Sequence, residues 1–244
     1  FGEALAPSRY SAKYLREFRA TQSSHVWNAE YQQHPTAPEG DFFKIGRIDI
    51  VDAIPAEIGA VMKVSEHDYV PIKMKKGIRF WDMAASEKKQ LKKDPDSTSG
   101  TLMDEQDDIF FILDNINEQL GPYEVQDIIK LTAKVDGKNV KVWMEQEPGS
   151  AGKSLIAFYI RELKGFIVGG RPATGSKMVR ADSFASQVNA GNVKILKAPW
   201  NKRYLAQLAS FPRGAHDDDI DSSSGAFNEL TGGDTWDTVG FGNV

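Results

Sequence analysis

Apolar residues between positions 46 and 230 recur in two patterns. Continuous apolar residues, or apolar residues that alternate with polar ones, predict strands. Apolar residues that return every three or four positions predict helices. The pattern predicts strands over residues 79–85, 99–104, 108–116, 139–146, 165–170 and 193–198. It predicts helices over residues 123–135, 154–163, 179–191 and 203–211, and a last helix that starts at about 216. Three strands followed by alternating helices and strands indicate an α/β fold, with a mixed sheet and helices on both of its faces.

The segments on either side of this region lack such a pattern. Residues 1–45 predict an arm, in which a short helix over 11–20 precedes the Pro/Gly-rich stretch 34–41, typical of a linker. Residues 231–244 are rich in glycine and predict a flexible tail. We therefore expect one domain over residues 46–230, between an arm and a tail.

Composition excludes several kinds of chemistry. The chain of 244 residues has no cysteine, which excludes disulfides, thiolate-bound zinc and thiol catalysis. Its four histidines lack the HExxH spacing of a zinc site; they are His25, His34, His67 and His216. No apolar run approaches the roughly 18 residues of a membrane span, so we expect no membrane partner.

The net charge of −4 argues at first against a nucleic-acid partner. Residues 216–244, however, contain seven acidic residues and no Lys or Arg, which leaves 30 basic and 27 acidic residues in 1–215. Acidic residues gathered in one place can bind metal ions that partly cancel their charge. They can equally form a solvated acidic tail, and the charge alone leaves both interpretations open.

Acidic residues lie where predicted strands and helices begin or end. Asp82 lies inside an apolar strand, Glu145 ends another, and Asp217 and Asp218 begin the last helix. A carboxylate in an apolar strand is unfavourable unless it is paired or bound to metal, and hard divalent cations prefer several carboxylate oxygens. Two such ions about 4 Å apart can activate a water at a phosphodiester. Taken singly, each acid also has a structural explanation: Asp82 caps a turn and Glu145 pairs with a surface lysine.

The start of the last helix carries more acids than a metal site needs. Asp217 and Asp221 are four residues apart and share one helix face, whereas Asp218 points elsewhere. Because acids at a helix N-terminus also interact favourably with the macrodipole, some of them serve only the helix. We expect Asp219 to be one of these.

Seven stretches together resemble one known family in their order along the chain. They are AEYQQHPTAPEGDFFK (29–44), RFWDMAAS (79–86), DPDSTSG (94–100), VWMEQEPGSAGK (142–153), SKMVRADSFASQVNAGNV (176–193), APWNKRYLAQLASFP (198–212) and GAHDDDID (214–221). In this order the chain resembles the C-terminal nuclease domain of the large terminase subunit of tailed bacteriophages. The resemblance implies an RNase H-like mixed sheet flanked by helices. It also implies a magnesium- or manganese-dependent endonuclease that cuts concatemeric double-stranded DNA at the initiation and termination of packaging.

The resemblance assigns roles to individual residues. It implies metal binding and catalysis by two metal ions for Asp82, Glu145, Asp217 and Asp218, and a supporting position for Asp221. His216 directly precedes the acidic pair, and two interpretations stay open for it: contact with the substrate, or packing as a loop histidine. The motif ends in Ser222 where the family more often has alanine. Expected partners are double-stranded DNA, an ATPase domain of the full-length chain, the portal protein and the terminase small subunit, in the cytoplasm of a bacterial host.

Several basic residues are candidates for contacts with the DNA backbone, which require charge but no base recognition. They are Lys153, after the Gly-rich turn, and Lys177 and Arg180, at a helix start. The alternatives are that Lys153 is simply solvated and that Arg180 orders the helix terminus together with Asp182. A further cluster, Lys73, Lys75 and Lys76, is more typical of a solubilising surface.

The stretch EPGSAGKS resembles a phosphate-binding P-loop but departs from it at one position. Gly152, Lys153 and Ser154 fit the pattern, whereas Glu147 replaces the first glycine and would place a carboxylate against phosphate oxygens. We therefore expect no ATP site in this chain. Two functional classes remain: a nuclease, and a non-catalytic RNase H-like module that binds DNA or the portal protein.

Overall fold

The computed structural model describes residues 42–54, 77–83 and 97–232. Within these residues the strands form one mixed sheet in the order β1-β7-β4-β3-β2-β5-β6. The strands are β1 (Asp49–Val51), β2 (Ile78–Asp82), β3 (Thr98–Gln106), β4 (Ile109–Glu118), β5 (Lys141–Gln146), β6 (Ile167–Pro172) and β7 (Val193–Leu196). Strand β3 is antiparallel to both of its neighbours, and the other neighbouring strands are parallel.

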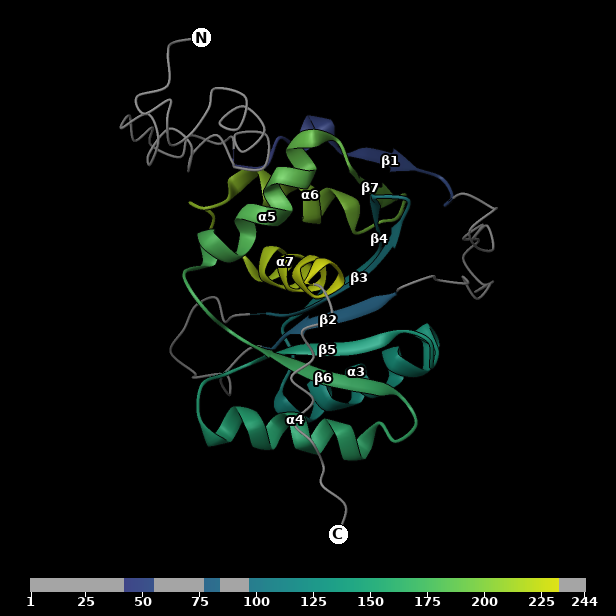
Figure 1. Ribbon diagram of the computed structural model, residues 1–244, viewed down its shortest axis with the longest axis vertical. Helices are drawn as coiled ribbons and strands as arrows, with labels where there is room; N and C mark the ends of the chain where they lie inside the picture. Colours follow the sequence, from purple (N-terminus) through teal and green to yellow (C-terminus); the bar gives the residue numbers. More distant parts are fainter. Residues whose placement is uncertain (1–41, 55–76, 84–96, 233–244) are drawn as a thin grey trace, which may run out of the picture.

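Helices cover both faces of the sheet, as Figure 1 shows. One face carries α3 (Pro122–Asp136) and α4 (Ser150–Glu162), and the other carries α5 (Lys177–Ala190), α6 (Asn201–Ser210) and α7 (Asp218–Thr231). A 3-10 turn, η2 (Ile45–Arg47), precedes β1. The predicted α/β class, with a mixed sheet and helices on both faces, is confirmed. None of the described helices is long and apolar enough to cross a membrane.

The alternation of side chains along β2 separates two cores. Phe80 packs with α5, α6 and α7, whereas Trp81 packs with α3 and α4. Because alternate residues of a strand share a face, Asp82 projects toward the same side as Phe80. Phe42 and Phe43, upstream of the expected domain start at residue 46, are buried in the core on the side of Phe80.

Helix α7 lies close against β2 at a glycine. A Cβ atom at Gly225 would fall 2.3 Å from Cε1 of Phe80, so any larger residue would push the helix away from the strand. Asp221 and Asp218 lie four and seven residues before Gly225, on the same side of the helix. The close approach at Gly225 therefore brings the acids of α7 toward the carboxyl end of β2.

A buried arginine holds β2 in place on the opposite side. The Arg79 guanidinium donates hydrogen bonds of 2.8 Å to both carboxylate oxygens of Asp136, at the end of α3. It donates a third, also of 2.8 Å, to Asp114 of β4. This arrangement ties the strand that carries Asp82 to a helix and to a second strand.

Candidate metal and nucleic-acid site

Two carboxylates lie side by side at the ends of parallel strands. The register of β2 and β5 pairs Trp81 with Met144, so the next residues, Asp82 and Glu145, are neighbours at the carboxyl edge of the sheet. Glu145 follows Trp143 by two positions, and Trp143 packs in the core on the α7 side. Both carboxylates therefore project toward α7.

The start of α7 adds further carboxylates to this edge. Asp218 and Asp221 are buried in the first turn of the helix. Asp217 is the N-cap residue, but its side chain makes no capping hydrogen bond. These acids are separated from Glu145 by more than seventy positions in the sequence, and the packing of α7 on β2 brings them together.

The pKa values of these acids indicate how strongly their charges interact. Burial, followed by the charges of Asp221, Glu145 and Asp218, raises the pKa of Asp82 well above its ordinary value. Burial and the neighbouring charge of Asp217 raise the pKa of Asp218 to about 6. Burial also raises the pKa of Glu145, although Arg180 acts in the opposite direction. The carboxylates thus share one region in which full ionisation requires nearby positive charge.

In this structure α5 supplies that positive charge. The Lys177 ammonium lies 2.7 Å from Asp217 Oδ1 and 2.8 Å from Asp221 Oδ2. The Arg180 guanidinium lies 3.0 Å from Asp221 Oδ1 and 3.7 Å from Glu145 Oε2. Lys177 bridges Asp217 and Asp221, so these two carboxylates lie close together as their spacing predicts, although Asp217 is the N-cap rather than a residue of the helix. Asp218, which was expected to point elsewhere, lies on the same side of α7 as Asp221.

The residues present fit a hard divalent cation in chemistry and in charge. The Oδ2 atom of Asp218 is buried and has no hydrogen-bond partner, and a buried polar atom of this kind calls for an explanation such as an ion. The Nδ1 atom of His216 lies 3.9 Å from this oxygen. Within the described residues, no three acidic or histidine side chains converge closely enough, as they stand, to hold a metal ion. Side-chain rotation would be needed to gather their oxygens.

A pocket of about 210 Å³ lies beside the acids, between α5, α7 and the carboxyl ends of β5 and β6. Glu145 and Asp221 line it together with Arg171 and Arg180. Arg171 lies opposite Glu145 in the register of β5 and β6, and its guanidinium forms an ion pair of 3.2 Å with Glu229 of α7. The pocket is therefore lined by carboxylates and guanidinium groups side by side. This lining suits a phosphate group, which is anionic and can contact both the guanidinium groups and a metal ion held by the carboxylates.

Comparison with known proteins identifies the family. The model of the family described as "Terminase RNaseH-like domain" matches residues 79–230. The chain belongs to this terminase family. A search of the curated proteins found no match.

Two solved structures show the same fold. The human cytomegalovirus terminase nuclease domain, soaked with Mn and with an inhibitor bound, is 14% identical with a TM-score of 0.52; the match covers 80% of this chain and 94% of that one. The large terminase of a thermophilic bacteriophage, in complex with ADP, is 11% identical with a TM-score of 0.56. That match covers 91% of this chain and 52% of the other, so this chain spans about half the length of the phage protein. The chain is thus an RNase H-like domain of the terminase family.

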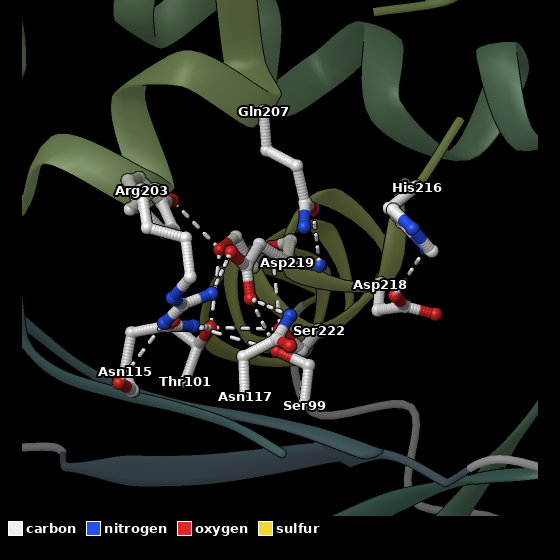
Figure 2. A network of polar contacts seen from close by, with 12 residues as sticks. Ser99, Thr101, Asn115, Asn117, Arg203, Gln207, His216, Asp218, Asp219 and Ser222 are labelled. Carbon is white, nitrogen blue, oxygen red and sulfur yellow. Dashed lines mark hydrogen bonds and ion pairs between the residues drawn. The ribbon is translucent and has the colours of Figure 1, made fainter. Parts of the chain in front are cut away.

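Behind the acids, a buried polar network joins α7 of the terminase domain to β3 and β4 (Figure 2). At its centre is Asp219, which is fully buried. Its Oδ1 atom accepts hydrogen bonds of 2.8 Å from Ser99 and from Asn117, and its Oδ2 atom accepts one from Arg203. The prediction that Asp219 serves only to cap the helix is therefore wrong, because its side chain points into the sheet rather than toward the helix end.

Serine hydroxyls continue this network along α7. Ser222 lies 2.9 Å from the Ser99 hydroxyl and 2.8 Å from that of Thr101. One position further, Ser223 contacts the Tyr204 hydroxyl of α6 at 2.7 Å. Sequence reasoning missed this network, and the only signal that pointed to it was the run of serines in a helix that had to be buried.

The remaining predicted residues have different positions. Lys153 is exposed in the first turn of α4, which packs on the opposite face of the sheet from α7. His216 lies in the loop before α7, beside Asp218. Other predicted features lie outside the described residues: the helix over 11–20, the three other histidines (His25, His34, His67) and the cluster of Lys73, Lys75 and Lys76.

Proposed function

We propose that this domain is a magnesium- or manganese-dependent endonuclease that cleaves concatemeric double-stranded DNA when packaging begins and ends. The observation that carries the proposal is the gathering of carboxylates from β2, β5 and α7 at one edge of the sheet, where burial and mutual repulsion raise the pKa of Asp82. Such repulsion is unfavourable for a fold and useful for binding cations. The human cytomegalovirus relative was soaked with Mn, which agrees with this choice of metal.

The residues that would hold metal are Asp82 and Glu145 of the strands and Asp217 and Asp218 at the start of α7, with Asp221 beside them to supply a further oxygen. Two bound divalent cations would supply an activated water and stabilise the charge that develops on the phosphodiester. Asp82 and Glu145 are fixed by strands, whereas the α7 acids are fixed by the network around Asp219. Arg180 and Arg171 line the adjacent pocket, where guanidinium groups would contact the DNA backbone.

The wider setting is proposed from the family. The phage large terminase structure contains ADP and is about twice as long as this chain. We infer that the full-length protein also has an ATPase domain. Nucleotide would bind in that domain rather than at the P-loop-like stretch EPGSAGKS, where Glu147 replaces the first glycine. Double-stranded DNA, the portal protein and the terminase small subunit would then be the partners, in the cytoplasm of a bacterial host.

Nicking of supercoiled plasmid tests the proposal directly. The protein would be incubated with Mn²⁺, with Mg²⁺ and with chelator, alongside Asp82→Asn and Glu145→Gln. The matched control is Asp127→Asn, because Asp127 is an α3 carboxylate whose side chain is 80% exposed. We expect nicking that requires metal, persists in the control and is lost in both site variants.

Two results would count against the proposal. Nicking by Asp82→Asn at the rate of the unmodified protein would remove the site from the reaction. Failure of the folded protein to nick with either metal, while it still binds duplex DNA, would favour the non-catalytic DNA-binding module instead.

A further inference from the structure

Both carboxylate oxygens of Asp221 are engaged by cations from α5. Lys177 contacts Oδ2 at 2.8 Å and Arg180 contacts Oδ1 at 3.0 Å. The Asp221 side chain is only 5% exposed, so water cannot replace these partners easily. A divalent cation that binds at Asp221 must therefore displace at least one of the two side chains, because like charges repel at such distances.

The two cations differ in how firmly they are held. Arg180 is 20% exposed and also contacts Glu145 and the backbone carbonyl of Gly175, at 3.7 Å and 3.3 Å. Lys177 is the first residue of α5 and its side chain is 50% exposed. Its flexible stem allows the ammonium to move into solvent without disturbing the helix. Lys177 is the cation that can leave.

We infer that Lys177 is an internal counter-ion of the acid cluster that exchanges with the metal and is taken up by a DNA phosphate. The inference rests on the proposed function, since it concerns how the same site is loaded. Without metal, the ammonium neutralises Asp217 and Asp221 and keeps the start of α7 against α5. When metal binds, the ammonium is released into the region that the DNA backbone would occupy.

This exchange couples the two ligands. A phosphate that binds the Lys177 ammonium draws it away from Asp217 and Asp221, and so frees carboxylate oxygens for metal. By linkage, metal that displaces Lys177 raises the affinity for DNA by the same factor. Lys177 thereby makes the binding of metal favourable chiefly when DNA is present.

Mn²⁺ titration by calorimetry tests the inference without relying on cleavage. The unmodified protein would be compared with Lys177→Met, with Lys177→Arg and with the control Lys197→Met. Lys197 suits this purpose because its ion pair with Asp52, 3.1 Å long, is exposed on both sides. Each protein would be titrated alone and in complex with a short phosphorothioate duplex, which slows hydrolysis.

We expect Lys177→Met to bind Mn²⁺ about fivefold more tightly than the unmodified protein when DNA is absent. The duplex should raise the Mn²⁺ affinity of the unmodified protein and change that of Lys177→Met little. Lys177→Arg, which keeps the charge, should restore weak binding, and Lys197→Met should behave as the unmodified protein. In the absence of metal, Lys177→Met should also unfold at a lower temperature, because it leaves Asp221 with one counter-ion fewer.

Other results separate this inference from the proposed function. Mn²⁺ binding by Lys177→Met that is equal to or weaker than that of the unmodified protein would overturn the counter-ion role. Tighter Mn²⁺ binding by Lys177→Met, together with no nicking by the unmodified protein, would support the counter-ion role while removing the nuclease assignment. Absence of Mn²⁺ binding in both proteins would overturn both.

Discussion

Asp219 offers the sharpest test of how α7 is positioned, through the substitution Asp219→Ala. The carboxylate is fully buried and accepts hydrogen bonds from Ser99, Asn117 and Arg203. Its loss would leave the Ser99 hydroxyl and the Asn117 amide short of an acceptor, at about 1 kcal/mol or more each. The Arg203 side chain is 37% exposed, so water replaces part of its lost ion pair, and its share is at most about 1 kcal/mol.

Together these losses should lower the free energy of unfolding by about 3 kcal/mol, a substantial part of the roughly 5–15 kcal/mol typical of a domain. Urea denaturation followed by circular dichroism measures this quantity, provided that the m-value is unchanged. Asp219→Asn keeps an acceptor for Ser99 and Asn117 and loses only the interaction with Arg203. It should therefore be less destabilised than Asp219→Ala.

A double-mutant cycle with Arg203→Met isolates the ion pair. Asp219→Asn, measured where it is fully folded, should also bind Mn²⁺ more weakly than the unmodified protein, because Asp218 is the preceding residue on the same helix. A loss of less than about 1 kcal/mol in Asp219→Ala would refute the reasoning. It would mean that the network satisfies its donors without Asp219.

Three further predictions concern the surroundings of the site. Arg79→Met leaves Asp114 and Asp136 without their buried cation and should lower the free energy of unfolding by about 3–5 kcal/mol, measured by urea denaturation. An unchanged urea midpoint would contradict the role of Arg79 in holding β2. Gly225→Ala places a Cβ atom 2.3 Å from Phe80 and should lower the free energy of unfolding by about 1–3 kcal/mol. It should also weaken Mn²⁺ binding measured by calorimetry. If neither the stability nor the Mn²⁺ affinity changed, α7 would be free to shift on β2. The raised pKa of Asp218, about 6 against 3.8, means that the folded domain binds this proton more tightly than the unfolded chain, so ionisation lowers stability as the pH rises through about 6. Without metal, Asp218→Asn should therefore raise the melting temperature by about 3–6 °C at pH about 7.5 and hardly change it below pH about 4. An equal rise at both pH values would show that the effect does not come from ionisation of Asp218.

The sequence predicts most of the fold because long elements carry a clear period. Strands such as 109–118 and helices such as 122–136 were found close to their observed bounds. The strand over 49–51 was missed because it has only three residues, is largely exposed and pairs only with β7 at the edge of the sheet. Helix α4 begins four residues earlier than predicted, since its first turn, Ser150–Lys153, is polar and glycine-containing and carries little apolar signal.

The candidate site was predictable only in part, for a related reason. The acids stand out in the sequence because a carboxylate in an apolar strand requires an explanation. Lys177 contacts Asp217, 40 residues away, and Arg203 donates a hydrogen bond to Asn115 of β4, 88 residues away. No local sequence pattern records contacts over such separations. Lys177 was expected to face DNA, and the structure places it on the acids themselves. Its contact with DNA stays a prediction.

The polar start of α7 carries two stripes with different tasks. Asp218, Asp221 and Gly225 lie along one side of the helix, toward β2. Asp219, Ser222 and Ser223 lie along the neighbouring side and bond to β3 and to α6. In a globular helix, the buried side is normally apolar. On the side of Asp219, hydrogen bonds take the place of apolar packing, while Ile220 and Phe227 of the same helix pack in the core. Because hydrogen bonds are directional, they fix the rotation of the helix as well as its position. A rotation that moved Asp218 and Asp221 away from Asp82 would break the Asp219 network at the same time, so the acids keep their place even though they repel one another.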